Sequence, residues 1–143
     1  MEDRYLFKGK RLDNGEWVTG NLIQNPFFKG VRSWISSEQE DKTRLRSISR
    51  TQALWNSIEV DPSTICQCTG LKDKTGKMIC ENDIVETQYG KAVVVWDKSE
   101  WRIKWIDELI WRKDLHYWAN DNGCRIEVIG NIFDNPELLE VQE

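Results

Sequence analysis

Short segments rich in β-branched and aromatic residues, separated by turn-forming residues, constrain the fold of this chain more than any other feature. In residues 91–96 (KAVVVW), four of the six positions are Val or Trp, which favour strands. A polar turn at residues 97–99 follows, and residues 101–105 (WRIKW) then alternate bulky apolar with basic side chains. A period of two is typical of a strand with one buried face. The pattern predicts a β-hairpin over residues 91–105.

Similar signals recur along the rest of the chain. An Asn14-Gly15 pair, which readily takes the positive φ angles of a tight turn, predicts a hairpin between residues 5–7 and 17–22. A second tight turn is expected at residues 81–83, where Asn82 tolerates the left-handed region better than most residues. Further strands are expected at residues 31–36, 45–48, 57–60, 65–71, 78–79, 84–85 and 125–132.

Helical signals are few by comparison. Residues 107–119 fit either a helix or an irregular segment, and residues 135–139 fit a helical turn that begins with an Asn cap and a Pro. Many short strands with few helices predict an all-β chain in a small barrel, and the second half has the cadence of an SH3-like barrel. We expect an N-terminal β subdomain over residues 1–65 and a C-terminal SH3-like barrel subdomain over residues 66–143.

The charge of the chain differs between these two parts. Residues 1–65 carry ten Lys and Arg against nine Asp and Glu, whereas residues 66–143 carry ten against fifteen, for a net charge of −4 over the chain. An acidic chain is not a typical non-specific nucleic-acid binder. No apolar run approaches the roughly 20 residues of a membrane span, the first residues are charged, and four cysteines fit a reducing compartment. We expect a cytoplasmic protein with no membrane partner.

Four stretches of the chain, taken together, resemble one known family. They are residues 7–11 (FKGKR) with 14–20 (NGEWVTG), 60–64 (VDPST), 69–77 (TGLKDKTGK) followed by 81–85 (ENDIV), and 127–132 (EVIGNI) with 135–139 (NPELL). In this order they are similar to the YopX family of phage and prophage proteins. The resemblance implies a phage or prophage product in a bacterial cytoplasm, with a largely β fold in two parts, and it brings no established activity and no catalytic residues. The chain departs from the family pattern at Cys68, where an aromatic residue is usual, and at Asn82, where Gly is usual.

The polar segment of residues 37–52 is one candidate interaction surface. Its Arg44, Arg46 and Arg50 make it locally basic. A solvated loop is the commoner meaning of such a run, and partner binding is the sharper interpretation.

The tryptophans supply the second candidate surface, since five of the eight fall between residues 96 and 118. Alternation places Trp101 and Trp105 on one face and basic side chains on the other, which suits a core face better than a stacking platform. The candidate interaction residues here are Trp101, Arg102, Lys104, Trp105 and Trp111.

Metal and catalytic signatures are weak. Cys66 and Cys68 are separated by one residue, whereas structural zinc sites use pairs separated by two to four, and Cys80, Cys124 and His116 form no second pair. Buried thiols acting as small hydrophobes explain these cysteines. With a single histidine, no local nucleophile motif and no phosphate-binding Gly-rich loop, we expect no enzyme, no metal and no cofactor.

These observations leave two hypotheses for function. The first is a phage or prophage accessory protein of unknown activity that acts through protein–protein contacts, either by self-association or with an unknown phage or host protein. Its basis is the surplus of aromatic residues, which are enriched in interface cores. The alternative is a nucleic-acid-binding module, which the SH3-like cadence and the basic loop favour by analogy.

Overall fold

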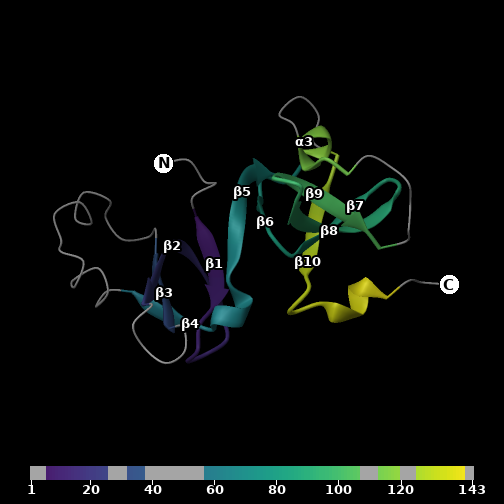
Figure 1. The fold of residues 1–143 in the computed structure, drawn as a ribbon. Helices are drawn as coiled ribbons and strands as arrows, with labels where there is room; N and C mark the ends of the chain where they lie inside the picture. Colours follow the sequence, from purple (N-terminus) through teal and green to yellow (C-terminus); the bar gives the residue numbers. More distant parts are fainter. Residues whose placement is uncertain (1–5, 26–31, 38–56, 107–112, 120–124, 141–143) are drawn as a thin grey trace. The chain divides into compact units, whose positions relative to one another are not determined.

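The computed structural model describes residues 6–25, 32–37, 57–106, 113–119 and 125–140, and most of these lie in antiparallel strands (Figure 1). The prediction of an all-β chain with few short helices is confirmed. The chain divides into two compact units, an N-terminal unit over Arg4–Gln67 and a C-terminal unit over Cys68–Glu143. That residues 1–65 and 66–143 are separate domains stays a prediction.

The N-terminal unit is a sheet with the strand order β4-β3-β2-β1-β5. Its elements are β1 (Phe7–Lys10), β2 (Trp17–Asn25), β3 (Arg32–Ser37), β4 (Ile58–Val60), the 3₁₀ turn η2 (Pro62–Thr64) and the start of β5 (Cys66–Lys72). The predicted turn between β1 and β2 is present, with Gly15 at φ 73°. The predicted strand around residues 45–48 lies outside the described residues.

One face of this sheet is packed closely enough to require glycine at two positions. Ile35 and Val60 are fully buried there, and a Cβ on Gly9 would lie 3.2 Å from Val60. A Cβ on Gly20 would collide with the backbone carbonyl of Ser36 on the neighbouring strand. The β2 and β3 backbones therefore approach each other at Gly20, and β1 leaves room at Gly9 for the side chains of Val60 and Ile35.

The N-terminal sheet also curls back on itself. The Asp61 N–H donates to Lys10 O at 2.8 Å and the Leu12 N–H donates to Glu59 O at 3.1 Å, so β4 lies beside the residues that follow β1. A single bridge, Arg11–Val60, accompanies these bonds. Among the described residues, no continuous ladder closes the sheet into a barrel.

The C-terminal unit contains a four-stranded sheet with the order β10-β7-β8-β9. Its elements are β6 (Met78–Cys80), which pairs with β5, then β7 (Asp83–Thr87), β8 (Gly90–Asp97), β9 (Glu100–Trp105), the short helix α3 (Leu115–Trp118), β10 (Glu127–Asn131) and the 3₁₀ turn η3 (Pro136–Leu139). The expected turn residue Asn82 takes φ 68°.

The predicted SH3-like barrel is wrong for the described part of this unit, because the sheet is open. Its two outer strands bond to irregular segments instead of to each other. On one edge, the Ile103 N–H of β9 donates to Lys113 O at 2.7 Å. On the other edge, the Lys74 N–H donates to Ile126 O at 3.0 Å, just before β10 begins. These segments satisfy the edge groups that a closed barrel would pair.

The core of the C-terminal unit lies against this sheet. It includes two tryptophans, Trp105 and Trp118, whose ring centroids are 5.6 Å apart in an edge-to-face arrangement. The other core residues are aliphatic or small: Ile79, Val85, Ala92, Val94, Ile103, Leu115, Ala119, Ile126 and Val128. No helix in the described part of the chain combines the length and the apolar character of a membrane-spanning segment.

Asp73 joins the turn after β5 to β10. Its Oδ1 accepts hydrogen bonds from the Thr75 N–H at 2.9 Å, the Thr75 hydroxyl at 2.7 Å and the Lys77 N–H at 2.9 Å. Its Oδ2 accepts from the Val128 N–H at 2.9 Å, and the residue is 5% exposed. Burial raises the pKa of Asp73, but the hydrogen bonds from Thr75, Val128 and Lys77 outweigh it and hold the pKa below its ordinary value.

We expect Asp73→Asn to lower the free energy of unfolding by about 2–3 kcal/mol at neutral pH, because the amide turns one acceptor into a donor that faces backbone N–H groups. Urea unfolding followed by circular dichroism measures the change. The matched control is Asp13→Asn, whose exposed carboxylate forms a surface ion pair with Arg11 and should leave the unfolding midpoint in place.

The same variant should show a defined pH dependence. The folded pKa of Asp73 lies below the unfolded value of about 3.9. Its stabilising contribution is therefore complete above that pH and is lost as the pH falls through the folded pKa. The stability difference between the wild type and Asp73→Asn should shrink below about pH 4. A difference that stays constant from neutral pH to about pH 3 would contradict this account of the carboxylate.

Candidate functional site

The end of the β8–β9 hairpin carries an aromatic pair on the face that elsewhere forms the core. In the hairpin register, Val94 is paired with Ile103 and Trp96 with Trp101. Because side chains alternate along a strand, these two pairs share one face. Val94 and Ile103 are buried, whereas Trp96 is 56% exposed. The apolar face of the hairpin therefore continues beyond the core that covers it.

The two rings at this end contact each other. The centroids of Trp96 and Trp101 are 5.0 Å apart with an interplanar angle of 73°, an edge-to-face arrangement. Trp101 is half-buried against the core. The hairpin then turns at Lys98 and Ser99, both with positive φ, as a two-residue turn requires. The core thus fixes Trp101, and Trp101 in turn supports a largely exposed Trp96.

Charged residues of both signs neighbour the aromatic pair in the hairpin, and alternation directs Asp97, Glu100 and Arg102 to the opposite face. Asp97 and Glu100 carry negative charge, Lys98 and Arg102 carry positive charge, and their formal charges cancel. The Arg102 guanidinium lies 3.2 Å from the Glu100 carboxylate. We call Trp96, Trp101 and these four charged residues the hairpin end. It combines an apolar pair on one face with neighbouring charges that sum to zero.

The structure places the predicted residues of β9 as their alternation indicates. Trp105 is buried in the core, Lys104 is exposed on the opposite face, and Arg102 is half-buried. The core therefore covers Trp105, and Arg102 and Lys104 lie on the face opposite Trp101, so the predicted residues do not share one exposed face with Trp101. The other predicted interaction residues, Arg44, Arg46, Arg50 and Trp111, lie outside the described residues.

Trp96 is not among the interaction residues that the sequence analysis predicted. Its signal was present, because Trp96 has the same parity as Val94 in the strand and borders the turn. A bulky apolar residue at the last core-facing position of a hairpin can reach past the core. How far the core extends depends on packing against α3 and β10, which the sequence pattern does not give.

The N-terminal sheet holds a second aromatic surface, and here basic groups share the face. Lys10 is the cross-strand partner of Trp17, and the Lys8 and Lys10 ammonium groups lie 4.9 and 5.5 Å from the Trp17 ring centroid. The Arg32 guanidinium lies 5.3 Å from the Trp34 ring centroid. Alternation along β2 puts Trp17 on the same face as Ile23, the partner of Trp34. The sequence pattern had not singled out this surface, which we call the N-terminal face.

The positive charge of the N-terminal face is partly neutralised. Arg32 Nη2 lies 2.8 Å from a carboxylate oxygen of Glu59. The hydrogen bond from Arg32 and its charge lower the pKa of Glu59, so the carboxylate is ionised at neutral pH. Lys8 and Lys10 supply the remaining cationic groups near the tryptophans.

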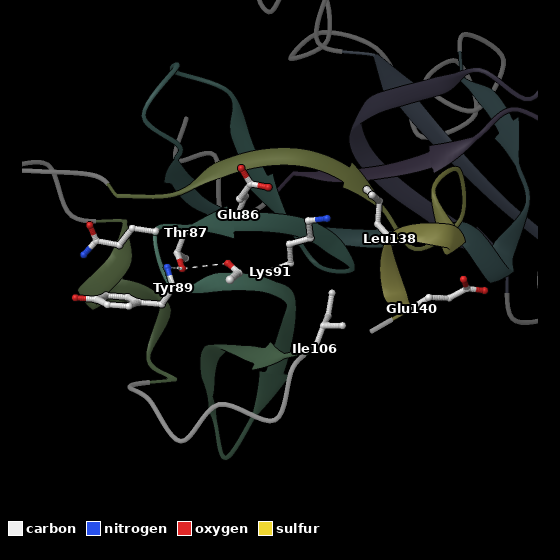
Figure 2. Close-up of a pocket in the computed structure, with 9 residues that line it drawn as sticks. Glu86, Thr87, Tyr89, Lys91, Ile106, Leu138 and Glu140 are labelled. Atoms are coloured by element: carbon white, nitrogen blue, oxygen red, sulfur yellow. Dashed lines mark hydrogen bonds between the residues drawn. The ribbon is translucent and has the colours of Figure 1, made fainter. Parts of the chain in front are cut away.

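A depression of about 440 Å³ lies where β7 turns into β8 (Figure 2). Glu86 and Lys91, which are cross-strand partners, line it together with Tyr89 and Ile106. Thr87 also lines the depression. Its hydroxyl accepts a hydrogen bond from the Tyr89 N–H and donates one to Gly90 O (Figure 2). That hydroxyl maintains the turn. The depression therefore offers a polar surface without an activated nucleophile among its lining residues.

The cysteines do not assemble a metal site within the described chain. Cys66, Cys68 and Cys80 are buried, whereas His116 is exposed on α3, and no group of three metal-ligating side chains occurs among the described residues. Cys124 lies outside them. The Cys66 thiol donates to Thr64 O at 3.2 Å, and the Cys80 thiol lies 2.8 Å from Cys68 Sγ.

Comparisons with known proteins identify a family and a solved structure with a similar fold. The family model described as YopX protein matches residues 6–140. The chain is similar to a crystal structure of protein EF1440 from Enterococcus faecalis, with a TM-score of 0.52 and 23% identity over 94% of this chain and 96% of that one. A comparison with curated proteins found no match. At this identity the structural likeness concerns the fold alone.

Proposed function

The chain belongs to the YopX family, and from this premise we propose that it is a non-catalytic accessory protein of a phage or prophage that associates with a second copy of itself in the cytoplasm. The observation that carries the proposal is the exposure of Trp96 at the hairpin end, where 56% of the residue is accessible. The phage setting follows from the family resemblance.

Tryptophan at such a position favours binding for energetic reasons. Burying an aromatic side chain is worth about 1.5–3 kcal/mol, and Trp is enriched among the residues that dominate interface energies. The contact with Trp101 restricts the Trp96 side chain before any partner binds. Trp96 therefore loses less conformational entropy on binding than an unsupported tryptophan would. The hairpin end is therefore suited to a contact surface.

The charges of the hairpin end favour a second copy as the partner. In a two-fold symmetric contact each residue meets the same patch on the other subunit, so a patch carrying both signs can complement itself. Asp97 and Glu100 of one copy can face Lys98 and Arg102 of the other. A strongly charged partner would gain little from a hairpin end whose charges cancel.

We expect the mass of the wild-type protein to rise toward that of a dimer at tens of micromolar, and Trp96→Ser to weaken this association at least about tenfold, because Trp96 would lose its buried area in the contact. Sedimentation velocity or light scattering across a concentration series measures both effects.

Leu12→Ser is the matched control, because Leu12 is 59% exposed but lies in the N-terminal unit. It should leave the association unchanged. A constant monomer mass of the wild type would overturn the proposal. Association that survives Trp96→Ser but fails in Leu12→Ser would keep self-association and reject the hairpin end as its surface.

Nucleic-acid binding is the second candidate function, and the N-terminal face favours it. Two tryptophans and three basic side chains occupy one face of a sheet there, an arrangement that single-stranded nucleic acids use for stacking and phosphate contacts. Against it stand the net charge of −4 and the ion pair between Arg32 and Glu59.

We expect no sub-micromolar binding to single- or double-stranded DNA at physiological salt, because too few phosphate contacts are available on an acidic chain. Fluorescence anisotropy with labelled oligonucleotides at several salt concentrations measures the affinity. Sub-micromolar binding that weakens steeply with salt and with Lys8→Gln/Lys10→Gln would place nucleic-acid binding first. Loss with Arg44→Ala/Arg46→Ala instead would assign it to the basic loop.

A further inference from the structure

Two buried thiols face each other across the β5–β6 ladder. Cys68 of β5 and Cys80 of β6 are cross-strand partners. Their Sγ atoms are 2.8 Å apart, and the residues are 0% and 3% exposed. A disulfide has an S–S length of about 2.05 Å, so the two sulfurs need to approach by only roughly 0.8 Å. Of the cysteines in the described chain, these two have the only thiol–thiol contact.

We propose that Cys68 and Cys80 are a modification site that forms a reversible intramolecular disulfide when the protein meets a small peroxide. The backbone already supplies the register, since directly opposed positions of an antiparallel pair bring their Cβ atoms close together. The disulfide therefore needs no rearrangement of the fold. This inference is independent of the hairpin end and of the proposed function.

The alternatives for this cysteine pair are simple packing and metal binding. A soft metal ion would need further ligands, and no group of three candidate ligands occurs among the described residues. Packing alone explains one buried cysteine, as it does for Cys66, whose thiol donates to a backbone carbonyl. It does not account for two sulfurs in direct contact at paired positions.

The reaction balances with peroxide as the oxidant. One thiol, as its thiolate, attacks a peroxide oxygen, the O–O bond breaks, and a sulfenic acid and one water form. The second thiol attacks the sulfenic sulfur, the S–S bond forms, the S–O bond breaks and a second water leaves. Two electrons pass from the sulfurs to the peroxide, and a small thiol reductant reverses the change by disulfide exchange.

Burial sets the expected rate of this oxidation. Because the thiols are 3% exposed or less, the peroxide must reach them through local opening. The three-residue strand β6 is suited to such opening, since its register with β5 shifts between the pairs Cys68–Cys80 and Lys72–Met78. Oxidation should therefore be slow compared with that of an exposed thiol, yet complete, because the disulfide is trapped once formed.

The disulfide would cross-link β5 to β6. It closes a loop between residues twelve positions apart, which contains the Asp73 turn. Cross-linking a loop of this size restricts the unfolded chain and raises stability. One of the two linked cysteines, Cys68, is the first residue of the C-terminal unit. Oxidation would thus fix β6 against β5 at the first residue of that unit.

The test uses the full chain, purified with reductant and then treated with stoichiometric hydrogen peroxide. Remaining thiols are alkylated and the intact mass is measured. The reduced protein has four cysteines and should take four adducts, whereas the oxidised protein should take two. A tryptic digest should then link residues 51–72 to residues 78–91, and reductant should restore four adducts. The Tm should rise by roughly 5–10 °C on oxidation.

Three variants assign the bond. Peptide 51–72 contains both Cys66 and Cys68, so Cys66→Ser is the matched control and should still form the linkage and keep the Tm rise. Cys68→Ser and Cys80→Ser should form neither, with circular dichroism confirming that each is folded. Four adducts on the peroxide-treated wild type would overturn the proposal, and so would linkage through Cys66 or Cys124.

Discussion

The Asp73 carboxylate is the interaction on which the C-terminal unit depends. One buried side chain orders the turn after β5 through Thr75 and Lys77, and it binds the N–H of Val128 on β10. A buried carboxylate is tolerated only when hydrogen bonds replace its hydration, and here four of them do so. Because that turn occupies the edge beside β10, the sheet can remain open without an unpaired strand at this side.

An open sheet with satisfied edges explains why the proposed contact surface lies at the end of a hairpin. The edge strand β9 bonds to Lys113 along its middle, so its edge is not the natural place for a partner strand. The two strands of the β8–β9 hairpin extend farther than the core that lies against them. What they present there is a side-chain surface around Trp96, not a row of backbone groups. This distinction favours a contact through packing over one through strand addition.

Short-range sequence patterns predicted the strands and turns of much of this structure. Alternation predicted β9, Asn14-Gly15 predicted the first hairpin, and Asn82 predicted a turn with positive φ. The sequence could not predict the open sheet, because the choice between barrel and open edges depends on contacts as distant as Asp73 with Val128. The exposed Trp96, the N-terminal face and the thiol contact depend in the same way on register between strands.

Three polar side chains whose chemistry can serve catalysis have structural roles in this fold. Thr87 holds the β7–β8 turn through its hydroxyl, Asp73 joins a turn to β10, and the buried Asp83 accepts from the Cys80 N–H at 2.8 Å. Each would have to give up a bond to the fold before acting on a substrate. Trp96 differs, because its one ring contact leaves more than half of the residue accessible. This supported but exposed side chain is the observation behind the proposed contact surface at the hairpin end.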